Sequence, residues 1–347
     1  MRNLSDEALD LTEIPGGCQP SPLHCIEQAI AGLRQYQALT TSFDLGLLDI
    51  LHKPMTAREC AESTGCRPDL ISLLCDGLTL LGFLEKAGDQ YCTTEFSRRY
   101  FTRDAPFPQE NAIAFQRRLA GLWLHLPDIL KSGPVTYNRA EMFRDVIIPS
   151  MADNCRCGLL QRVTRSVAAI PEFRMARRLL DLGGGHGLYS IAFCMKNPEL
   201  EAVVFDLPPV TSATRDFIAR YHATRVSTLE GDFFKDPIGN GYDILFSSSN
   251  PGGKVPTLIP KIADSLKKGG LFINKQALDD IPADPWSDLE WNLWTFEGVQ
   301  KKPVRYTFDN SVPLVEYNRR LIDHGFEIRE IVPVDSLSAM TIAQKTT

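Results

Sequence analysis

Leu179-Leu180-Asp181-Leu182-Gly183-Gly184-Gly185-His186-Gly187 is the most informative stretch of this 347-residue chain. An apolar segment that carries one acid runs into four glycines, and a helical pattern begins near Leu188. Because glycine has no side chain, it allows positive φ or the close approach of another group. The stretch therefore predicts a buried strand, a tight turn and a helix, with a ligand lying over the turn.

The spacing of the glycines narrows the kind of ligand. A dinucleotide site has the pattern G-x-G-x-x-G/A, which leaves the helix N-terminus free for a pyrophosphate. Here Gly183, Gly185 and Gly187 form G-x-G-x-G, and the bulky Leu188 follows. An anionic pyrophosphate is also unfavourable beside Asp181, so the turn favours a cationic nucleoside.

Two further strand ends carry matching groups. The segment 201–206 reads as a strand that ends in Asp206, placed to accept both hydroxyls of a ribose. After the strand at 225–230, the carboxylate of Asp232 suits the adenine amino group and the ring of Phe233 suits the adenine face. These three strand ends fit S-adenosylmethionine (SAM), which carries a sulfonium and an ammonium group and no phosphate.

The segments DLGGGHG at 181–187, FDLP at 205–208 and GDFF at 231–234 resemble the SAM-dependent small-molecule O-methyltransferases of the plant-type and bacterial family. The resemblance runs from about Leu23 to the C-terminus. It implies an α/β Rossmann-like class I methyltransferase domain over 171–347. It also implies a mostly α winged-helix dimerisation domain over 23–100, preceded by a tail at 1–22. The cofactor residues that it implies are Asp181, Gly183, Gly184, Gly185, Asp206, Leu207, Gly231, Asp232, Phe233, Ser247 and Ser248.

Strand and helix patterns alternate regularly from Arg177 onward, as in a doubly wound sheet. The last two predicted strands lie close enough in sequence to pair antiparallel as a hairpin, which completes a seven-stranded sheet. The predicted strands are 178–182, 201–206, 225–230, 242–247, 271–276, 326–332 and 339–343.

The N-terminal region has a helix-turn-helix pattern followed by a hairpin. Thr56 and Glu59 form a capping box before one helix, 67–81 forms the next, and two short strands flank Gly88. Over 23–100 there are seven basic and ten acidic residues, a balance of 7 − 10 = −3, which disfavours a nucleic-acid partner. The second helix is mostly apolar, so we expect it to contact protein and to form a homodimer.

Composition and charge disfavour several other classes of protein, namely those that bind nucleic acid, a membrane or a metal ion. The formal charge is −6, and no apolar run approaches the length of a membrane span, so we expect neither nucleic acid nor a membrane as partner. No export signal opens the chain, and nine scattered cysteines suggest free thiols in a cytoplasmic protein. The pair Cys155 and Cys157 has no second pair or nearby histidine, so we expect no metal site.

Large apolar residues fill the helical segment 101–170 and the region after Asp284. Their spacing alone indicates packing in a core. The resemblance implies that the first segment connects the two domains and walls an acceptor pocket, and that the second caps this pocket over a flat aromatic or bulky small molecule. The acceptor-contacting residues that it implies are Trp123, Phe143, Met151, Asn154, Trp291 and Trp294.

The chain departs from the family where a catalytic histidine follows the fourth strand. Residues 247–254 read SSSNPGGK, the family's histidine falls near Gly252, and no histidine lies between His222 and His324. The acceptor could need no base, as with a thiolate, an activated carbon or an acidic hydroxyl. Asn250, Lys254 or His125 could replace the histidine. The segment 249–251 could hold an amine or amide nitrogen, as an N-P-P loop does, or 247–253 could simply be a turn.

These features predict a SAM-dependent methyltransferase that acts on oxygen, carbon, sulfur or nitrogen of a small acceptor. Two alternatives remain open. One is a winged-helix protein that senses SAM or a metabolite through a non-catalytic domain. The other is an enzyme of the same family that uses SAM for decarboxylation or hydroxylation.

Overall fold

The structure, a computed structural model, describes residues 22–280, 282, 284–299, 301, 303 and 310–346. These residues form two compact units, one that ends at Pro108 and one that begins at Gln109. All of the tail predicted over 1–22 except residue 22 lies outside the described residues. No helix within the described residues is both long and apolar enough to cross a lipid bilayer.

The first unit packs five helices around a small antiparallel sheet of order β1-β3-β2. Its capping box is present, since Thr56 Oγ1 accepts the amide of Glu59 and the Glu59 carboxylate accepts the amide of Thr56. Leu48, Leu78 and Tyr91 are among its buried core residues. The elements are α1 (Pro22–Asp44), α2 (Leu47–Ile50), β1 (Met55–Thr56), α3 (Ala57–Thr64), α4 (Pro68–Leu80), β2 (Leu84–Ala87), β3 (Gln90–Thr93) and α5 (Glu95–Tyr100).

Two helices of this unit expose apolar side chains. On α1 the exposed residues recur every three or four positions, which places them on one stripe of the helix. On α4 the exposed leucines lie opposite the buried residues Ile71, Cys75 and Leu78. The exposed residues are Leu23, Ile26, Ile30 and Leu33 on α1, and Leu70, Leu73 and Leu80 on α4.

The second unit begins with a run of helices that the sequence predicted as helical over 101–170. Residues 135–137 instead form a short strand, β4, which pairs in parallel with β10 from the region after Asp284. The elements are α6 (Glu110–Leu124), α7 (Leu126–Ser132), β4 (Val135–Tyr137), α8 (Arg139–Met142), the π-helix η1 (Phe143–Ile147), α9 (Ile148–Arg156), α10 (Leu159–Ala168) and the 3-10 helix η2 (Pro171–Arg174).

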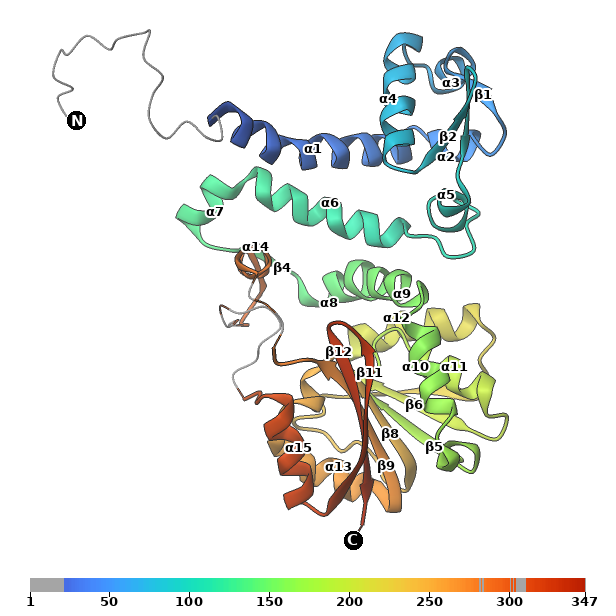
Figure 1. The fold of residues 1–347 in the computed structure, drawn as a ribbon. Coiled ribbons are helices and arrows are strands. Elements are labelled where there is room, and N and C mark those ends of the chain that lie inside the picture. The colour runs from blue at the N-terminus through green and yellow to red at the C-terminus, as the bar shows by residue number, and fades with distance from the viewer. Residues whose placement is uncertain are drawn as a thin grey trace, which may run out of the picture. The chain divides into compact units, whose positions relative to one another are not determined.

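A seven-stranded sheet of order β11-β12-β9-β8-β5-β6-β7 forms the centre of this unit, as predicted (Figure 1). Five strands are parallel, and β11 and β12 form the antiparallel C-terminal hairpin. The strands are β5 (Arg178–Leu182), β6 (Glu201–Asp206), β7 (Val226–Glu230), β8 (Tyr242–Ser248), β9 (Leu266–Ala277), β11 (Phe326–Asp335) and β12 (Ser338–Lys345).

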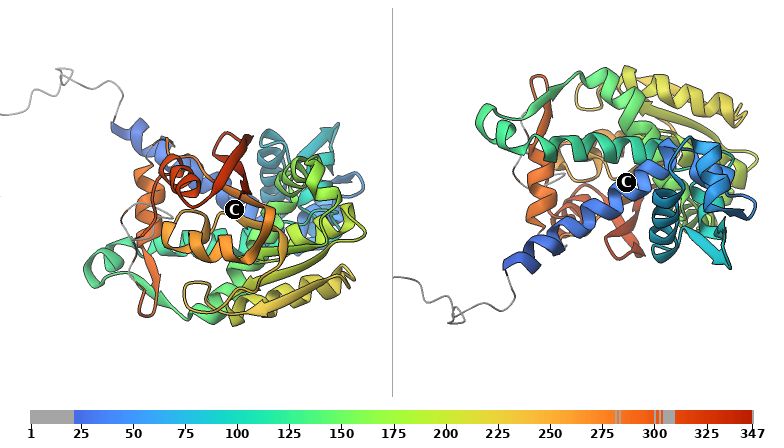
Figure 2. Two further views of the ribbon diagram at one scale, coloured as in Figure 1. Left: turned by 90° about the horizontal axis from the view of Figure 1, so that it is seen from below. Right: turned by 90° about the horizontal axis from the view of Figure 1, so that it is seen from above.

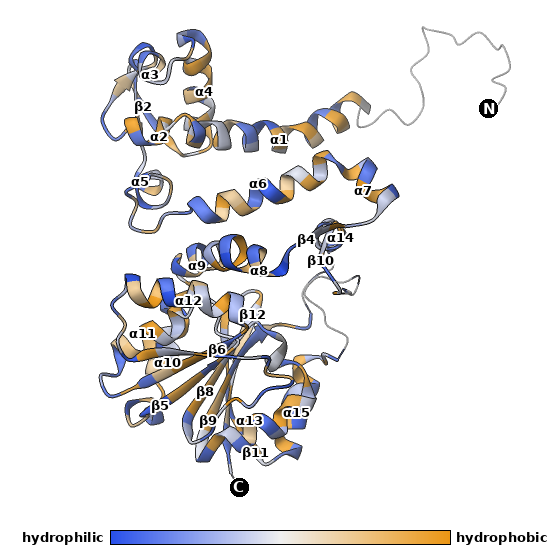
Figure 3. Cartoon of the chain, turned by 180° about the vertical axis from the view of Figure 1, so that it is seen from behind, coloured by the Kyte–Doolittle hydropathy of each residue, from blue (hydrophilic) through white to orange (hydrophobic). Residues whose placement is uncertain are grey.

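Helices cover both faces of the sheet (Figure 2). Apolar residues of α9, α10, α11 and α12 pack on one face, and those of α13 and α15 pack on the other. The central strands are correspondingly apolar (Figure 3). The remaining elements are α11 (Leu188–Lys196), α12 (Pro208–Arg220), η3 (Pro251–Gly253), η4 (Pro256–Leu258), α13 (Ile259–Ser265), α14 (Pro285–Asn292), β10 (Trp294–Phe296) and α15 (Leu314–Asp323).

Candidate functional site

The glycine turn connects β5 to α11 at the carboxyl edge of the sheet. Gly183 and Gly185 have φ of 65° and 57°, in the left-handed region that favours glycine. Gly184 is required for a different reason, because a Cβ atom there would lie 2.5 Å from Cγ of Asp181. The turn therefore brings bare backbone directly against a carboxylate.

Asp181 is a buried carboxylate with an unfilled acceptor. Its side chain is 1% exposed, and Oδ2 accepts a hydrogen bond of 2.8 Å from Ser190 Oγ. Oδ1 is buried and has no hydrogen-bond partner in the described part of the chain. Burial raises the pKa of Asp181 to about 7, with a further contribution from the charge of Asp206. A cationic group that entered the site would find this oxygen free to accept from it.

Asp206 ends β6 and holds two turns in place. Its Oδ2 accepts the amide of Gly185 at 2.9 Å, and its Oδ1 accepts the amide of Leu207 at 2.8 Å. Burial raises the pKa of Asp206, although these two amides act in the opposite direction. A carboxylate oxygen has two lone pairs, so each oxygen can still accept from a ligand hydroxyl.

The turn after β7 presents Gly231, Asp232 and Phe233. Burial alone would raise the pKa of Asp232, but the amide of Phe234 at 3.0 Å and the ammonium of Lys235 at 3.1 Å lower it. The backbone of this turn is held from α13, since Lys261 Nζ donates to the carbonyl oxygen of Phe233 at 2.8 Å. An ionised carboxylate and an aromatic ring thus follow the third strand.

The turn after β8 is tied to the glycine turn by Asn250. Asn250 Nδ2 donates to the carbonyl oxygen of Leu182 at 2.6 Å. Its Oδ1 accepts the amide of Gly252 at 2.8 Å and the hydroxyl of Ser247 at 3.2 Å. Ser247 is fully buried and Ser248 is partly buried at the end of the same strand. Both polar atoms of the Asn250 side chain are therefore engaged within the protein.

The backbone at Gly252, near which the resemblance places the family's histidine, is closely packed. A Cβ atom at Gly252 would lie 2.9 Å from Asn250 Oδ1 and 3.2 Å from Cδ2 of Leu182. The carbonyl oxygen of Gly252 also accepts a hydrogen bond of 3.0 Å from the buried Tyr317 hydroxyl. The turn is thus built for a glycine at this position, which the sequence alone did not reveal.

The other two candidate bases lie in different surroundings. Lys254 is half-buried and forms an ion pair of 2.9 Å with Asp279. His125 is exposed where α6 meets α7. The structure brings Asn250 to the sheet edge beside the glycine turn, whereas it places His125 in the helical segment.

Of the six residues expected to contact an acceptor, four belong to an aromatic cluster. Trp123 Nε1 donates to Glu290 Oε2 at 2.7 Å, which joins α6 to α14. Phe143 stacks on Phe296 with ring centroids 5.3 Å apart. Trp291 and Trp294 pack edge to face at 5.6 Å. The other two residues, Met151 and Asn154, are exposed on α9.

Lys301 also belongs to this cluster, although it is not among the residues predicted from the sequence. Its Nζ donates to the carbonyl oxygens of Trp291 and Trp294, each at 2.8 Å. The ammonium also lies 3.3 Å from the centroid of the Trp294 ring. Burial lowers the pKa of Lys301 to about 7. A single lysine after a tryptophan-rich segment has no sequence pattern that would identify this contact.

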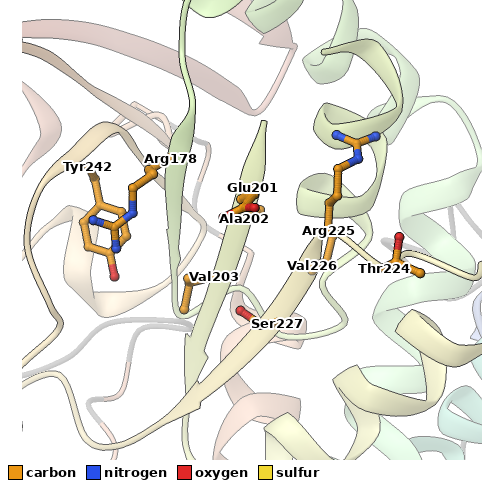
Figure 4. A pocket seen from close by; sticks show the side chains of 9 residues that line it. All are labelled: Arg178, Glu201, Ala202, Val203, Thr224, Arg225, Val226, Ser227 and Tyr242. Carbon is orange, nitrogen blue, oxygen red and sulfur yellow. The ribbon is translucent and has the colours of Figure 1, made fainter. Parts of the chain in front are cut away.

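A hollow of about 270 Å³ lies at the opposite edge of the sheet, among the amino ends of β5, β6, β7 and β8 (Figure 4). Its two arginines, Arg178 and Arg225, make contacts within the protein. Arg178 lies over the ring of Tyr242 at 5.0 Å, and Arg225 donates to three backbone carbonyls at the end of α11 and beyond. The groups suited to a nucleoside all lie at the carboxyl edge, so this hollow is not part of the candidate site.

Comparison with known proteins gives a consistent result over both units. Residues 136–295 match the O-methyltransferase domain, and residues 27–103 match the O-methyltransferase dimerisation domain. An uncharacterised protein of Methanocaldococcus jannaschii is 38% identical, over 91% of this chain and 87% of that protein.

Two further proteins are similar at lower identity. The 3-hydroxy-5-methyl-1-naphthoate 3-O-methyltransferase of Streptomyces sahachiroi is 27% identical, over 73% of this chain and 77% of that protein. An O-methyltransferase family protein from Burkholderia thailandensis has a similar solved structure, with a TM-score of 0.74 at 20% identity. The match covers 94% of this chain and 98% of that one.

Proposed function

Since this chain belongs to the O-methyltransferase family, we propose that it transfers a methyl group from SAM to a hydroxyl of a small aromatic acceptor. The observation that carries the proposal is the set of three carboxylates, Asp181, Asp206 and Asp232, at successive strand ends of one sheet edge. No phosphate-bearing cofactor would be favoured beside them.

The residues present fit SAM. The buried Oδ1 of Asp181, which lacks a partner in the described residues, suits the ammonium of the methionine end. Asp206 retains acceptor capacity for the ribose hydroxyls, and the ring of Phe233 can lie on the adenine while Asp232 accepts from its amino group. The backbone of Gly183, Gly184 and Gly185 leaves room for the ligand above the turn.

Bound SAM supplies a methyl group already activated by the sulfonium. The protein's contribution is to hold the two reactants in line and to keep water away from them. We assign positioning of the acceptor to the aromatic cluster of Trp123, Phe143, Trp291 and Trp294, because aromatic rings interact favourably with a flat ligand. The S. sahachiroi relative, which acts on a hydroxynaphthoate, supports an aromatic acceptor.

We further propose that the acceptor enters as an ionised hydroxyl and that no side chain after β8 takes its proton. The resemblance places the family's histidine near Gly252, and a Cβ at Gly252 would press on Asn250. Asn250 has no proton-accepting nitrogen, and its oxygen already accepts two hydrogen bonds. Its role in this proposal is to position the two turns.

The first unit supports assembly of a homodimer. It matches the dimerisation domain over 27–103, and its helices α3 and α4 with the hairpin of β2 and β3 have the order of a winged helix. The exposed apolar stripes of α1 and α4 lie on this unit. Burying such a surface against a second copy is favourable by roughly 25 cal/mol per Å² of apolar area.

The experiment is a methyl-transfer assay with SAM and a panel of aromatic hydroxy compounds, with thiols, amines and carbon nucleophiles as comparison arms. Formation of S-adenosylhomocysteine together with an O-methylated product supports the proposal. Tight binding of SAM without turnover on any acceptor would indicate a sensing protein. Conversion of an acceptor that requires SAM but yields no methylated product would indicate decarboxylation or hydroxylation. Asp206→Asn, which removes the ribose-directed charge at constant size, should lower the SAM affinity.

A further inference from the structure

Lys275 is a buried lysine that forms no close ion pair with a side chain of the described residues. It lies near the carboxyl end of β9 and is 5% exposed. Its Nζ donates one hydrogen bond, of 2.9 Å, to Ser249 Oγ. None of the ion pairs among the described residues includes Lys275. Because an isolated buried ammonium costs several kcal/mol, a lysine in this position calls for a partner that is not a side chain of the described residues.

The strand register places Lys275 close to the methionine end of the proposed cofactor site. Asp181 is in register with Phe246, and Phe246 is in register with Ile273, so these three residues share one face of the sheet. Lys275 is two residues beyond Ile273 and thus on the same face. Its strand is the second from that of Asp181, which places the two backbones about 10 Å apart across the sheet.

Two side chains from the covering helices lie near these groups. Burial raises the pKa of Cys155 on α9 to about 11. The charge of Lys275 lowers the pKa of this thiol and the charge of Asp181 raises it, so both groups lie near Cys155. Tyr189 of α11 packs against Phe246 with ring centroids 5.1 Å apart. A negative and a positive group therefore flank one small region of the sheet edge.

The ammonium of Lys275 is hydrogen-bonded to a residue at the protein surface. Its hydrogen-bond partner Ser249 is exposed, whereas the rest of the lysine side chain is covered. Ser249 also has φ of 53°, an uncommon conformation for a residue other than glycine. The charge of Asp335 raises the pKa of Lys275 without a close ion pair between them, and Asp335 Oδ1 accepts from the amide of Leu337 and the hydroxyl of Ser338. Two of the three donors of Nζ therefore remain available to a ligand.

We propose that Lys275 binds the α-carboxylate of the methionine end of SAM while Asp181 binds its α-ammonium. This inference rests on the proposed function, since it assigns a residue to the cofactor of that reaction. An amino acid carries both charges on one carbon atom, and the pair of Asp181 and Lys275 complements them with opposite charges from two strands. Burial lowers the pKa of Lys275, whereas the charge of Asp335 raises it. A lysine that acted as a base would have to be neutral and to reach the acceptor hydroxyl, and the test below distinguishes that role from charge pairing.

The test compares SAM with decarboxylated SAM, which keeps the sulfonium and the amino group and lacks only the carboxylate. Binding of each compound is measured by calorimetry to the full-length protein and to Lys275→Met and Lys275→Arg. Lys268→Met is the control, because Lys268 is exposed at the other end of the same strand. The wild-type protein should bind SAM about 10- to 100-fold more tightly than decarboxylated SAM, as expected for a charge-assisted hydrogen bond.

Lys275→Met should reduce the SAM affinity to that for decarboxylated SAM and leave the latter unchanged within about twofold. Lys275→Arg should recover part of the loss. The midpoint of thermal unfolding of the ligand-free Lys275→Met protein should not fall, because the substitution removes a buried unpaired charge.

Several results would overturn the assignment. Equal losses for both compounds would indicate a structural role for Lys275. Unchanged affinities with an altered pH profile of turnover would indicate a base, and unchanged SAM affinity with weaker binding of carboxylated acceptors would indicate an acceptor contact. If the wild-type protein binds SAM and decarboxylated SAM equally well, the inference about Lys275 is wrong. If the wild-type protein binds neither compound, the proposed function itself is contradicted.

Discussion

Asn250 Nδ2 lies 2.6 Å from the carbonyl oxygen of Leu182, and this hydrogen bond joins the turn after β8 to the glycine turn after β5. Asn250 Oδ1 also accepts hydrogen bonds from the backbone NH of Gly252 and the hydroxyl of Ser247. A residue that could be taken for a catalytic group thus holds together the two turns between which the methyl donor is proposed to bind.

We expect Asn250→Ala to lower both stability and SAM affinity. Loss of the amide leaves the Leu182 carbonyl and the Gly252 amide without their partners, which should cost about 2 kcal/mol in the free energy of unfolding. Denaturant titration and calorimetry with SAM measure the two effects. Asn240→Ala, at an exposed asparagine in the preceding loop, should change stability by less than about 0.5 kcal/mol. A variant with normal stability and SAM affinity but no turnover would instead assign Asn250 to catalysis.

Restoring the family's histidine should damage the protein. In Gly252→His the Cβ atom would meet Asn250 Oδ1 at 2.9 Å and Leu182 Cδ2 at 3.2 Å. We expect a loss of about 1 to 3 kcal/mol in the free energy of unfolding and no gain in turnover. Gly121→Ala is the control, since no atom lies within 4 Å of its Cβ position, and it should be neutral or stabilising by up to about 1 kcal/mol. A stable and faster Gly252→His protein would contradict the closed turn.

The sequence was sufficient for the parallel strands because each has a short apolar run bounded by glycine, proline or an acid. It also predicted that Asp181, Asp206 and Asp232 follow strands at one edge of the sheet, since the carboxyl ends of parallel strands meet there. Strand β4 could not be found in this way, because its three residues are stabilised by pairing with the distant β10.

The contacts of Asn250, Lys275 and Lys301 were equally inaccessible from sequence. Each depends on which group lies opposite in space: the Leu182 carbonyl for Asn250, the Ser249 hydroxyl for Lys275 and the Trp294 ring for Lys301. Periodicity records which face of an element a residue occupies, and it carries no information on the group that the residue meets there.

Charge on the α1 stripe should dissociate the dimer. In Ile26→Glu combined with Leu33→Glu, two exposed apolar residues one above the other on α1 become anionic, and burying them against a second copy becomes costly. Sedimentation velocity should show a monomer for this variant and a dimer for the wild type. Leu337→Glu, at an exposed leucine of the β11–β12 turn, should remain dimeric. A wild-type monomer, or a dimer that survives the double substitution, argues against this interface.

The pH dependence of turnover should be set by the pKa of the acceptor hydroxyl and not by the pKa of a side chain of the protein. If no side chain accepts the proton, only the ionised hydroxyl reacts, and the midpoint of log kcat/KM against pH moves with the pKa of the acceptor. At pH 7.5 a phenol of pKa near 10 should react about 10- to 100-fold more slowly than one of pKa near 7.5, because far less of it is ionised. A series of substituted phenols tests this. One midpoint common to all acceptors would reveal a base in the protein.

The buried carboxylate of Asp181 should give the ligand-free protein a distinctive pH profile. Burial raises the pKa of Asp181 to about 7, so the folded state keeps a proton that the unfolded state has already released above pH 4. Stability attributable to this group should therefore fall as the pH rises from about 4 to 7, by at most about 4 kcal/mol. The difference in unfolding free energy between wild type and Asp181→Asn, measured over this range, isolates the effect, since asparagine does not titrate.

Binding of SAM should show the opposite trend, because an ammonium pairs with the ionised form of Asp181. The wild-type affinity should rise by up to about tenfold between pH 6 and pH 8, while that of Asp181→Asn should be weaker and nearly constant. Calorimetry in buffers of different ionisation enthalpy would also detect release of a proton when SAM binds near pH 7. Parallel pH profiles for the two proteins would show that the carboxylate is already ionised before the cofactor arrives, and the pairing of Asp181 with the ammonium would lose its support.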